Sequence, residues 1–286
     1  MRWMKKRGFL TLAALLPLCF SCGVDFSPTD DPSYPYLHRN GDKRGQSYAS
    51  LREATTPLTL ELLSSRLERG YATLFFLTQD GCPGCASSEH SFLSYIKQSE
   101  VEAFDVYQDA STKGALFTFL TSMVETYPEY SKTIPSISKI TTPSIFIACS
   151  NTKIIHIPAS NNFENANAFA SQMKDLANYS YVYEFSSFAS FSSFYKGEGC
   201  LLCLEEEENP FYSGKVEPYA RSSSKKTAHV YLPSLSEAER KSFLDFANGK
   251  DILEIEKGGK ILTSFDSEID GDSAEKFAKS YLKSLL

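Results

Sequence analysis

The chain has 286 residues, a formal net charge of −6 and 22% charged residues. This length exceeds a single small domain, and 42% hydrophobic residues are enough to bury a core. An acidic chain has no general attraction for nucleic acid or for anionic lipid head groups, so nucleic acid is excluded as an expected partner.

The first 22 residues have the pattern of an export signal. Four positive charges lie within residues 1–8, and residues 9–20 are apolar but too few to span a membrane. Small residues flank Cys22, so the segment 1–22 resembles a bacterial lipoprotein signal in which Cys22 is lipidated; cleavage by an ordinary signal peptidase is the alternative. Loss of the signal removes four cations and lowers the formal charge to −10. One lipid anchor would hold the protein on the extracytoplasmic face of the cell membrane, where disulfides persist.

The remaining chain divides into a linker and two long patterned segments. Residues 23–56 combine Pro and Gly with Asp, Ser and Arg and show no apolar period, which predicts a flexible tether. The rest is long enough for two domains, which we expect at 57–178 and 179–286.

The segment 57–178 alternates helical and strand patterns. Apolar residues recur at helical spacing over 116–127, which predicts a helix that buries one stripe. The expected order is α-β-α-β-α-β-β-α, with helices at 58–69, 86–99, 116–127 and 166–177 and strands at 72–77, 103–107, 144–149 and 153–157.

Cys82, Pro83, Gly84 and Cys85 form a C-x-x-C motif where the strand 72–77 is followed by a helix. A cysteine at a helix N-terminus has a more stable thiolate, because unpaired backbone N–H groups and the helix dipole favour the anion. Pro83 suits the first helical position, since it has no N–H to leave unpaired. We therefore expect Cys82 to be the nucleophile and Cys85, one turn deeper and shielded, to be the resolving thiol.

Thr142 and Pro143 directly precede the strand expected at 144–149. Together with the C-x-x-C motif at a strand–helix junction, they give the chain a pattern that resembles the thioredoxin superfamily. The resemblance implies a thioredoxin-like fold, a redox-active disulfide between Cys82 and Cys85, and a cis bond before Pro143 beside the sulfurs. It also implies that the backbone of Thr142 faces a substrate strand and that no cofactor is needed. A trans proline at the start of an edge strand is the alternative.

One position departs from the thioredoxin pattern. Thioredoxins bury an acidic residue in the strand before the motif, where it assists proton transfer to the resolving cysteine. Phe76 holds that position here, and Asp80 is the nearest acid. Proton transfer at Cys85 would then depend on water or another group.

The segment 179–286 is expected to hold a diverged second thioredoxin-like domain. Phenylalanines recur every third residue from Phe185 to Phe194, a spacing nearer helix than strand. A second C-x-x-C motif follows at 200–203, and the later elements repeat the order of the first unit: a strand at 229–232, a helix at 237–247, a hairpin of 252–255 with 261–265, and a helix at 273–285.

Cys200 and Cys203 form this second motif. Four glutamates begin at Glu205, and their field opposes thiolate formation. No proline precedes the strand expected at 252–255. A structural disulfide between Cys200 and Cys203 is the leading interpretation, and a second redox dithiol is the alternative. A four-cysteine zinc site with the first pair is disfavoured by the wide separation of the pairs, so no metal is expected.

Two further residues have structural rather than catalytic interpretations. Cys149 alternates with apolar residues and is expected in the core, and His90 is expected at the surface rather than in catalysis.

Together the patterns predict a lipid-anchored, extracytoplasmic thiol–disulfide oxidoreductase that acts on exported proteins with thiols or disulfides and is reset by a separate redox partner. The alternative is a non-catalytic accessory or adaptor lipoprotein in which both cysteine pairs are structural disulfides.

Overall fold

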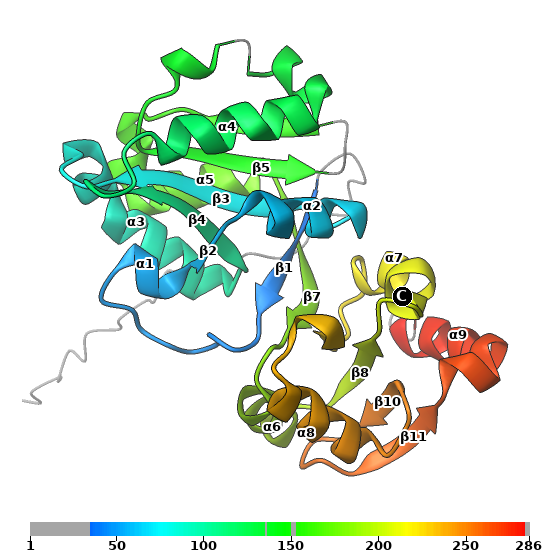
Figure 1. Ribbon diagram of the computed structural model, residues 1–286. Helices are drawn as coiled ribbons and strands as arrows, with labels where there is room; N and C mark the ends of the chain where they lie inside the picture. Colours follow the sequence, from blue (N-terminus) through cyan, green and yellow to red (C-terminus); the bar gives the residue numbers. More distant parts are fainter. Residues whose placement is uncertain (1–34, 135, 150–152, 284–286) are drawn as a thin grey trace, which may run out of the picture.

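The computed structural model describes residues 35–134, 136–149 and 153–283. These residues form two α/β domains, with strands β1 and β7 running between them (Figure 1). The predicted signal 1–22 with Cys22, and the part of the predicted tether before residue 35, lie outside the described residues. Within the described part of the chain, no helix combines the length and the apolar character needed to cross a membrane.

The first domain contains a five-stranded sheet in the order β2-β4-β3-β5-β6. β2, β4 and β3 are parallel, and β5 and β6 are antiparallel to their neighbours. Alternate residues of the central strand enter the cores on the two faces of the sheet, which is why this strand is a continuous apolar run. The strands are β2 (Thr56–Pro57), β3 (Thr73–Gln79), β4 (Ala103–Gln108), β5 (Ser144–Cys149) and β6 (Lys153–Ile157).

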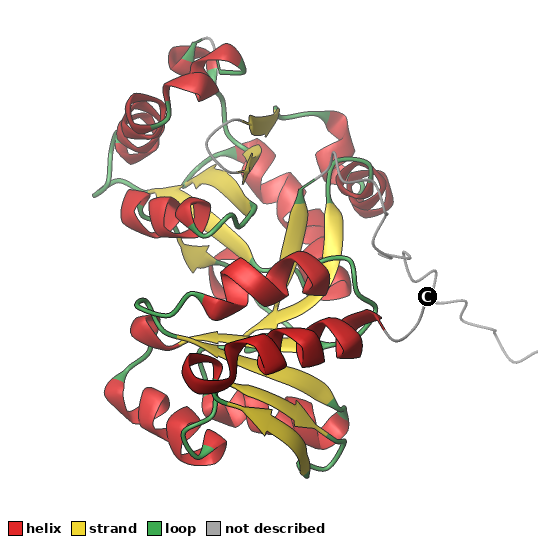
Figure 2. Cartoon of the chain, turned by 90° about the vertical axis from the view of Figure 1, so that its right-hand side faces the viewer, coloured by secondary structure: helices red, strands yellow, loops and turns green. Residues whose placement is uncertain are grey.

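Helices cover both faces of this sheet (Figure 2). α3 (Pro83–Ser99) and α5 (Ala166–Lys174) pack on one face, and α2 (Leu60–Glu68) and α4 (Ala115–Thr126) on the other. The helices predicted at 58–69, 86–99, 116–127 and 166–177 all form, because each presents one apolar stripe to the sheet. Short elements complete the domain: α1 (Leu51–Ala54) and the 3-10 helices η1 (Pro128–Lys132), η2 (Ile137–Lys139) and η3 (Asn161–Glu164).

The second domain contains a six-stranded sheet in the order β1-β7-β9-β8-β10-β11. Without β1, its strands follow the same order and directions as the first sheet. The predicted fold class, α/β with two tandem thioredoxin-like domains, is therefore confirmed. The strands are β1 (Tyr36–Asn40), β7 (Asn178–Glu184), β8 (Cys200–Glu205), β9 (Thr227–Tyr231), β10 (Ile252–Ile255) and β11 (Ile261–Phe265).

The helices of the second domain also pack on both faces of the sheet. α6 (Phe188–Gly197) and α8 (Glu237–Ala247) bury their aromatic residues in one core. The phenylalanine spacing from residue 185 thus marks a helix, as the sequence indicated. A π-helical turn η4 (Tyr212–Val216), α7 (Glu217–Ala220) and α9 (Ser267–Lys283) form the other core, and the 3-10 helix η5 (Leu232–Ser234) follows β9.

The expectation of a flexible tether over 23–56 is wrong for its described part, residues 35–56. β1 pairs in parallel with β7 of the second sheet. Its backbone also bonds to the first domain, since the Asn40 N–H donates to the Glu100 carbonyl at 2.7 Å and the Glu102 N–H donates to the His38 carbonyl at 2.8 Å. The segment therefore joins the two domains, an arrangement that depends on partners distant in the sequence.

Candidate functional site

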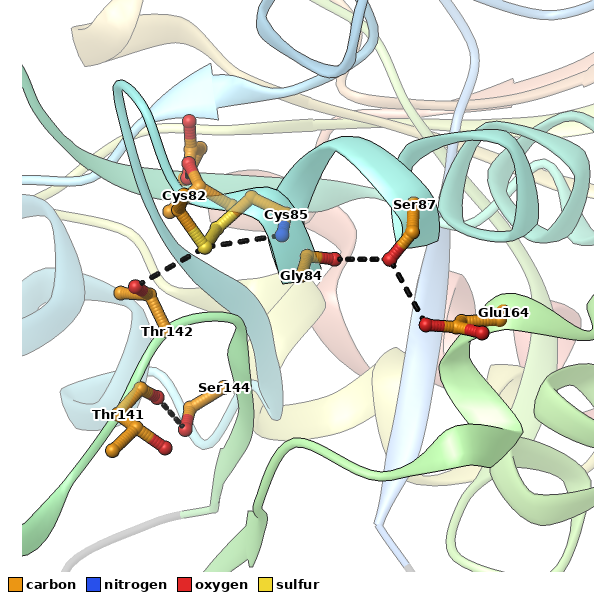
Figure 3. The surroundings of a disulfide bond; sticks show 10 residues. Cys82, Gly84, Cys85, Ser87, Thr141, Thr142, Ser144 and Glu164 are labelled. Atoms are coloured by element: carbon orange, nitrogen blue, oxygen red, sulfur yellow. Dashed lines mark hydrogen bonds between the residues drawn. A yellow bond between two sulfur atoms is a disulfide. The ribbon is translucent and has the colours of Figure 1, made fainter.

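The C-x-x-C motif lies at the N-terminus of α3, directly after β3 (Figure 3). Gly81 has a φ of +69°, a conformation that side chains rarely adopt, and this lets the chain turn from strand to helix. Cys82 is the N-cap residue and Pro83 takes the first helical position, as predicted. The Sγ of Cys82 accepts the backbone N–H of Cys85 at 3.0 Å, and the same N–H also lies 3.1 Å from the Cys82 carbonyl oxygen, so an N–H of the first helical turn is shared with this sulfur.

Cys82 and Cys85 are joined as a disulfide (Figure 3). Only 9% of the Cys82 surface is exposed, whereas Cys85 is partly exposed. The expectation that Cys85 would be the shielded cysteine is therefore wrong for the disulfide form. Cys82 is thus the more buried of the two cysteines, and two hydrogen bonds are directed at its sulfur.

The loop that contains Thr142 and Pro143, called the proline loop below, lies against the C-x-x-C motif. The Thr142–Pro143 peptide bond is cis. The Thr142 Oγ1 donates to the Sγ of Cys82 at 3.4 Å (Figure 3). A Cβ built on Gly84 would lie 3.0 Å from the Cδ of Pro143, so any side chain here would crowd the proline. The four residues predicted for the first site, Cys82, Cys85, Thr142 and Pro143, are brought together.

Two cavities flank the disulfide. One, of about 500 Å³, lies beside α1 and is lined by both cysteines together with Arg52, Thr78 and Glu89. The other, of about 520 Å³, is bordered by Cys82 but not by Cys85 and extends along the proline loop and α4. Both cavities reach Cys82 and share Gln79, Gly81 and Pro83 in their linings.

Asp105 is a buried acid near the site that the sequence reasoning missed. It lies on β4 and is the direct neighbour of Phe76 on β3. Phe76 holds the position where the thioredoxin pattern places its acid, so Asp105 lies one strand away from that position. Its Oδ1 accepts the hydroxyl of Thr78 at 2.9 Å, and Thr78 borders the cavity that contains both cysteines. Burial raises the pKa of Asp105 to about 6, against the opposing effects of the Thr78 hydrogen bond and Arg52. A single acid inside the apolar strand 103–107 was the sequence signal that could have identified it.

Asp80 is the acid nearest to the C-x-x-C motif in the sequence, and its surroundings differ from those of Asp105. It accepts a hydrogen bond from the hydroxyl of Tyr107. The guanidinium of Arg52 lies over the Tyr107 ring, 4.0 Å from its centroid. Asp80, Tyr107 and Arg52 thus form a polar wall on the α1 side of the disulfide.

Cys200 and Cys203 do not form the predicted disulfide, and both are free thiols. The motif lies inside β8 rather than at a helix start, and residues three apart in a strand point to opposite faces. Cys200 enters one core of the second domain and Cys203 the other, so the pair cannot share a disulfide or a metal. Burial raises the pKa of Cys200 to about 12. Burial also raises that of Cys203, and the nearby Glu205 adds only a smaller effect.

Cys149 and His90 lie apart from this chemistry. Cys149 is a partly buried free thiol that packs against the first core, close to the expected core position. Burial raises its pKa to about 11. His90 is exposed on α3, as expected for a surface residue.

No protein-family model and no curated protein matches the chain. The chain resembles solved structures that include human ERp44 form I, which is 10% identical over 83% of this chain and 58% of that chain, with a TM-score of 0.29. The bb fragment of ERp72 is 12% identical over 81% of this chain and 97% of that fragment, with a TM-score of 0.38. Full-length ERdj5 is 11% identical over 78% of this chain and 30% of that chain, with a TM-score of 0.28. The chain thus spans less than two thirds of the ERp44 and ERdj5 chains. At these identities and TM-scores, the thioredoxin-like fold rests on the strand order described above.

Proposed function

We propose that the protein is a thiol–disulfide oxidoreductase that exchanges disulfides with other proteins through Cys82 and Cys85. One observation carries the proposal: the disulfide lies at the start of α3, where the Sγ of Cys82 accepts both the N–H of Cys85 and the hydroxyl of Thr142. The same two donors would stabilise the Cys82 thiolate when the disulfide is reduced.

The exchange consists of two balanced displacements. A substrate thiolate attacks the Cys82 sulfur, the Cys82–Cys85 bond breaks, and Cys85 leaves as a thiolate that takes up a proton. A second substrate thiolate then attacks the substrate sulfur of the mixed disulfide and releases the Cys82 thiolate. Two electrons pass from the substrate dithiol to the cysteine pair. The reverse sequence reduces a substrate disulfide, and a separate redox partner would reset the pair.

The proposed place of action is the extracytoplasmic face of the cell membrane. The charged and apolar pattern of residues 1–20 and the small residues around Cys22 support export and a lipid anchor at Cys22. The substrates would then be exported proteins that carry thiols or disulfides, because disulfides persist in that compartment.

The binding-only alternative required two structural disulfides, and Cys200 and Cys203 are free thiols. A direct test is exchange between the reduced full chain and a disulfide-bonded protein substrate, followed with Cys82→Ser and Cys85→Ser. We expect Cys82→Ser to abolish exchange and Cys85→Ser to accumulate mixed disulfides with the substrate. Wild-type protein that shows no exchange, and a Cys85→Ser variant that traps nothing, would return the protein to a binding role.

A further inference from the structure

The two sulfurs of the disulfide are reached from different sides. Cys82 is 9% exposed and borders both cavities beside the pair. Cys85 is partly exposed and borders the cavity beside α1, called the α1 cavity below, but not the cavity along the proline loop. A polypeptide that lies against the proline loop therefore meets Cys82, whereas a molecule in the α1 cavity can also meet Cys85.

The α1 cavity is a preformed space between α1 and the start of α3. The backbone N–H of Leu51 in α1 donates to the Glu89 carboxylate of α3 at 2.8 Å. Leu51 and Ala54 are also buried in the same core as Phe92 of α3. The volume of about 500 Å³ lies in the range of sites that hold small molecules. The cavity can therefore hold a compact molecule beside the disulfide.

The lining of the α1 cavity suits an uncharged molecule. Its charged side chains are Arg52, Asp80 and Glu89, and each already has a partner. Glu89 accepts the Leu51 N–H, and Asp80 accepts the hydroxyl of Tyr107. The guanidinium of Arg52 lies 4.0 Å from the centre of the Tyr107 ring. The other lining residues are uncharged, so a small neutral molecule loses little hydration when it enters.

The two sulfurs also differ as leaving groups. Attack on one sulfur expels the other as a thiolate, and exchange is faster when the leaving thiol has the lower pKa. The Sγ of Cys82 accepts the Cys85 N–H at 3.0 Å and the Thr142 hydroxyl at 3.4 Å, and both donors stabilise its thiolate. Attack on Cys85, which expels Cys82, is therefore the chemically favoured direction for a molecule small enough to use the α1 cavity.

We infer that a low-molecular-weight, uncharged thiol enters the α1 cavity and reduces the pair by attacking Cys85, while protein substrates exchange at Cys82. The inference rests on the proposed function and names the class of its redox partner. The small thiolate attacks the Cys85 sulfur, the Cys82–Cys85 bond breaks, and Cys82 leaves as a thiolate. A second small thiolate attacks the sulfur of the bound small thiol, and Cys85 leaves. Two electrons pass from the two small thiols to the pair, which releases a small disulfide. One thiol proton ends on Cys85 and the other in the solvent.

The first test locates the attacked sulfur. The oxidised full chain is mixed with 2-mercaptoethanol and quenched with excess N-ethylmaleimide, which captures the cysteine released in the first step and so fixes the mixed disulfide. Tandem mass spectrometry of the peptide that contains residues 82–85 then assigns the two groups. We expect mercaptoethanol on Cys85 and N-ethylmaleimide on Cys82. The reverse assignment would overturn the inference, as would a pair that 2-mercaptoethanol does not reduce.

The second test narrows the α1 cavity. Ala86 lines it and is exposed on α3, and His90 lies one turn later on the same helix, exposed and outside the lining. Ala86→Leu should slow reduction by 2-mercaptoethanol about tenfold, because the added carbon atoms crowd the path to Cys85. His90→Leu is the matched control and should react at the wild-type rate. Thr142→Val should also slow the reduction, since it removes a donor from the leaving Cys82 thiolate.

A parallel reaction separates the inference from the proposed function. Protein that has been reduced with dithiothreitol and freed of it is mixed with a disulfide-bonded protein substrate, so this exchange needs no small thiol. We expect Ala86→Leu to slow this exchange less than it slows reduction by 2-mercaptoethanol. Equal slowing of both reactions, or no slowing relative to His90→Leu, would overturn the inference and leave the proposed function intact. Wild type that fails to exchange with the protein substrate would overturn the proposed function, and with it the role of the small thiol as redox partner.

Discussion

Glu184 and His229 form a buried ion pair, with 2.8 Å between Oε2 and Nδ1. The other Glu184 oxygen lies 2.7 Å from the Nδ1 of His38. The second nitrogens of the rings face further carboxylates, His38 Nε2 at 3.3 Å from Glu217 and His229 Nε2 at 3.0 Å from Glu205. Since ionised carboxylates only accept hydrogen bonds, each ring must be protonated on both nitrogens to satisfy them. The arrangement favours the protonated form of both buried histidines, and the neighbouring glutamates raise the pKa of each ring against the effect of burial.

This cluster lies where the two domains meet. His38 belongs to β1, and Tyr71 of the first domain contacts its ring with 4.5 Å between centroids. The Tyr71 hydroxyl also lies 3.2 Å from the Nδ1 of His229. Arg221 pairs with Glu217 at 2.9 Å, and the ring of Tyr212 stacks on His229. The charges around the two histidines are thus the glutamates 184, 205 and 217, with Arg221 at the edge and the Glu102 carboxyl close enough to interact with His38.

The first prediction is a loss of stability at high pH. Burial alone would lower the pKa of His229, but the charge of Glu184 and the hydrogen bonds to Glu184 and Glu205 raise it to about 9. The stabilisation is complete below the ordinary histidine pKa of about 6.5 and is lost as the pH rises through about 9. For Glu184, burial opposes ionisation, but His229 lowers its pKa well below the usual value, so its contribution is lost in acid. The free energy of unfolding, measured in urea, should therefore fall on both sides of a plateau.

Glu184→Gln should lower the free energy of unfolding by about 3–5 kcal/mol at pH 7, because it leaves buried imidazolium groups without their shared partner. Asp245→Asn is the control, since the Lys241–Asp245 pair is exposed and should contribute little. The assignment fails if Glu184→Gln and Asp245→Asn lower the free energy of unfolding by the same amount. It also fails if the alkaline limb of the wild-type profile is undiminished in His229→Gln, in which only His38 would still contribute.

The second prediction orders the thiols of the reduced protein. Cys82 should react first with iodoacetamide at pH 6, because the Cys85 N–H and the Thr142 hydroxyl are directed at its sulfur. Burial raises the pKa of Cys149 to about 11 and that of Cys200 to about 12, so both should be slow. Mass spectrometry of the alkylated peptides gives the order. Faster alkylation of Cys200 than of Cys82 would be incompatible with the proposed site.

The third prediction concerns Asp105. Burial raises its pKa to about 6, so the native state is most favoured below the ordinary value of about 3.9 and loses that stabilisation as the pH rises through about 6. Asp105→Asn should therefore raise the free energy of unfolding by about 1–3 kcal/mol at pH 8 and change it little at pH 4. Thermal unfolding at the two pH values measures the difference, with Asp245→Asn as the control. An equal change at both pH values would show that Asp105 does not titrate as described.

The fourth prediction tests the contact between Thr142 and Cys82. Thr142→Val removes the hydroxyl that donates to the Cys82 sulfur and keeps a similar side-chain volume. The pKa of the Cys82 thiol should rise by about one unit, since a hydrogen bond to a charged group is worth about 1.5 kcal/mol and one pKa unit is about 1.4 kcal/mol. Thr141→Val is the control, because Thr141 lines the same cavity and its hydrogen bond is made by the backbone carbonyl, which accepts the Ser144 hydroxyl. The pH dependence of alkylation measures both, and an unchanged pKa in Thr142→Val would remove this residue from thiolate stabilisation.

The fifth prediction concerns the anchor. Cys22→Ser should move the protein from the membrane fraction to the soluble fraction, because the serine hydroxyl cannot take the thioether-linked lipid. Immunoblots of fractionated cells measure the distribution, with Cys19→Ser as the control that keeps Cys22. Retention of Cys22→Ser in the membrane fraction would contradict lipidation at this residue.

Sequence reasoning succeeded where local interactions decide the structure. The C-x-x-C motif at 82–85 begins a helix because Cys82 can cap it and Pro83 suits its first turn. The hairpin of β10 and β11 and the helix α8 were predicted with their observed bounds, because apolar periods and turn residues are written within each segment. These features determined the α/β class and the first cysteine site.

Tertiary structure decided the features that depend on distant partners. A C-x-x-C spacing is one turn of a helix but places its cysteines on opposite faces of a strand, and pairing with β9 and β10 makes residues 200–205 a strand. β1 finds its partner β7 about half the chain away, and no local pattern shows that contact. Asp105 meets Thr78 only because β3 and β4 are neighbours in the sheet. Such contacts follow from the register of a sheet, which the packing of the whole core selects.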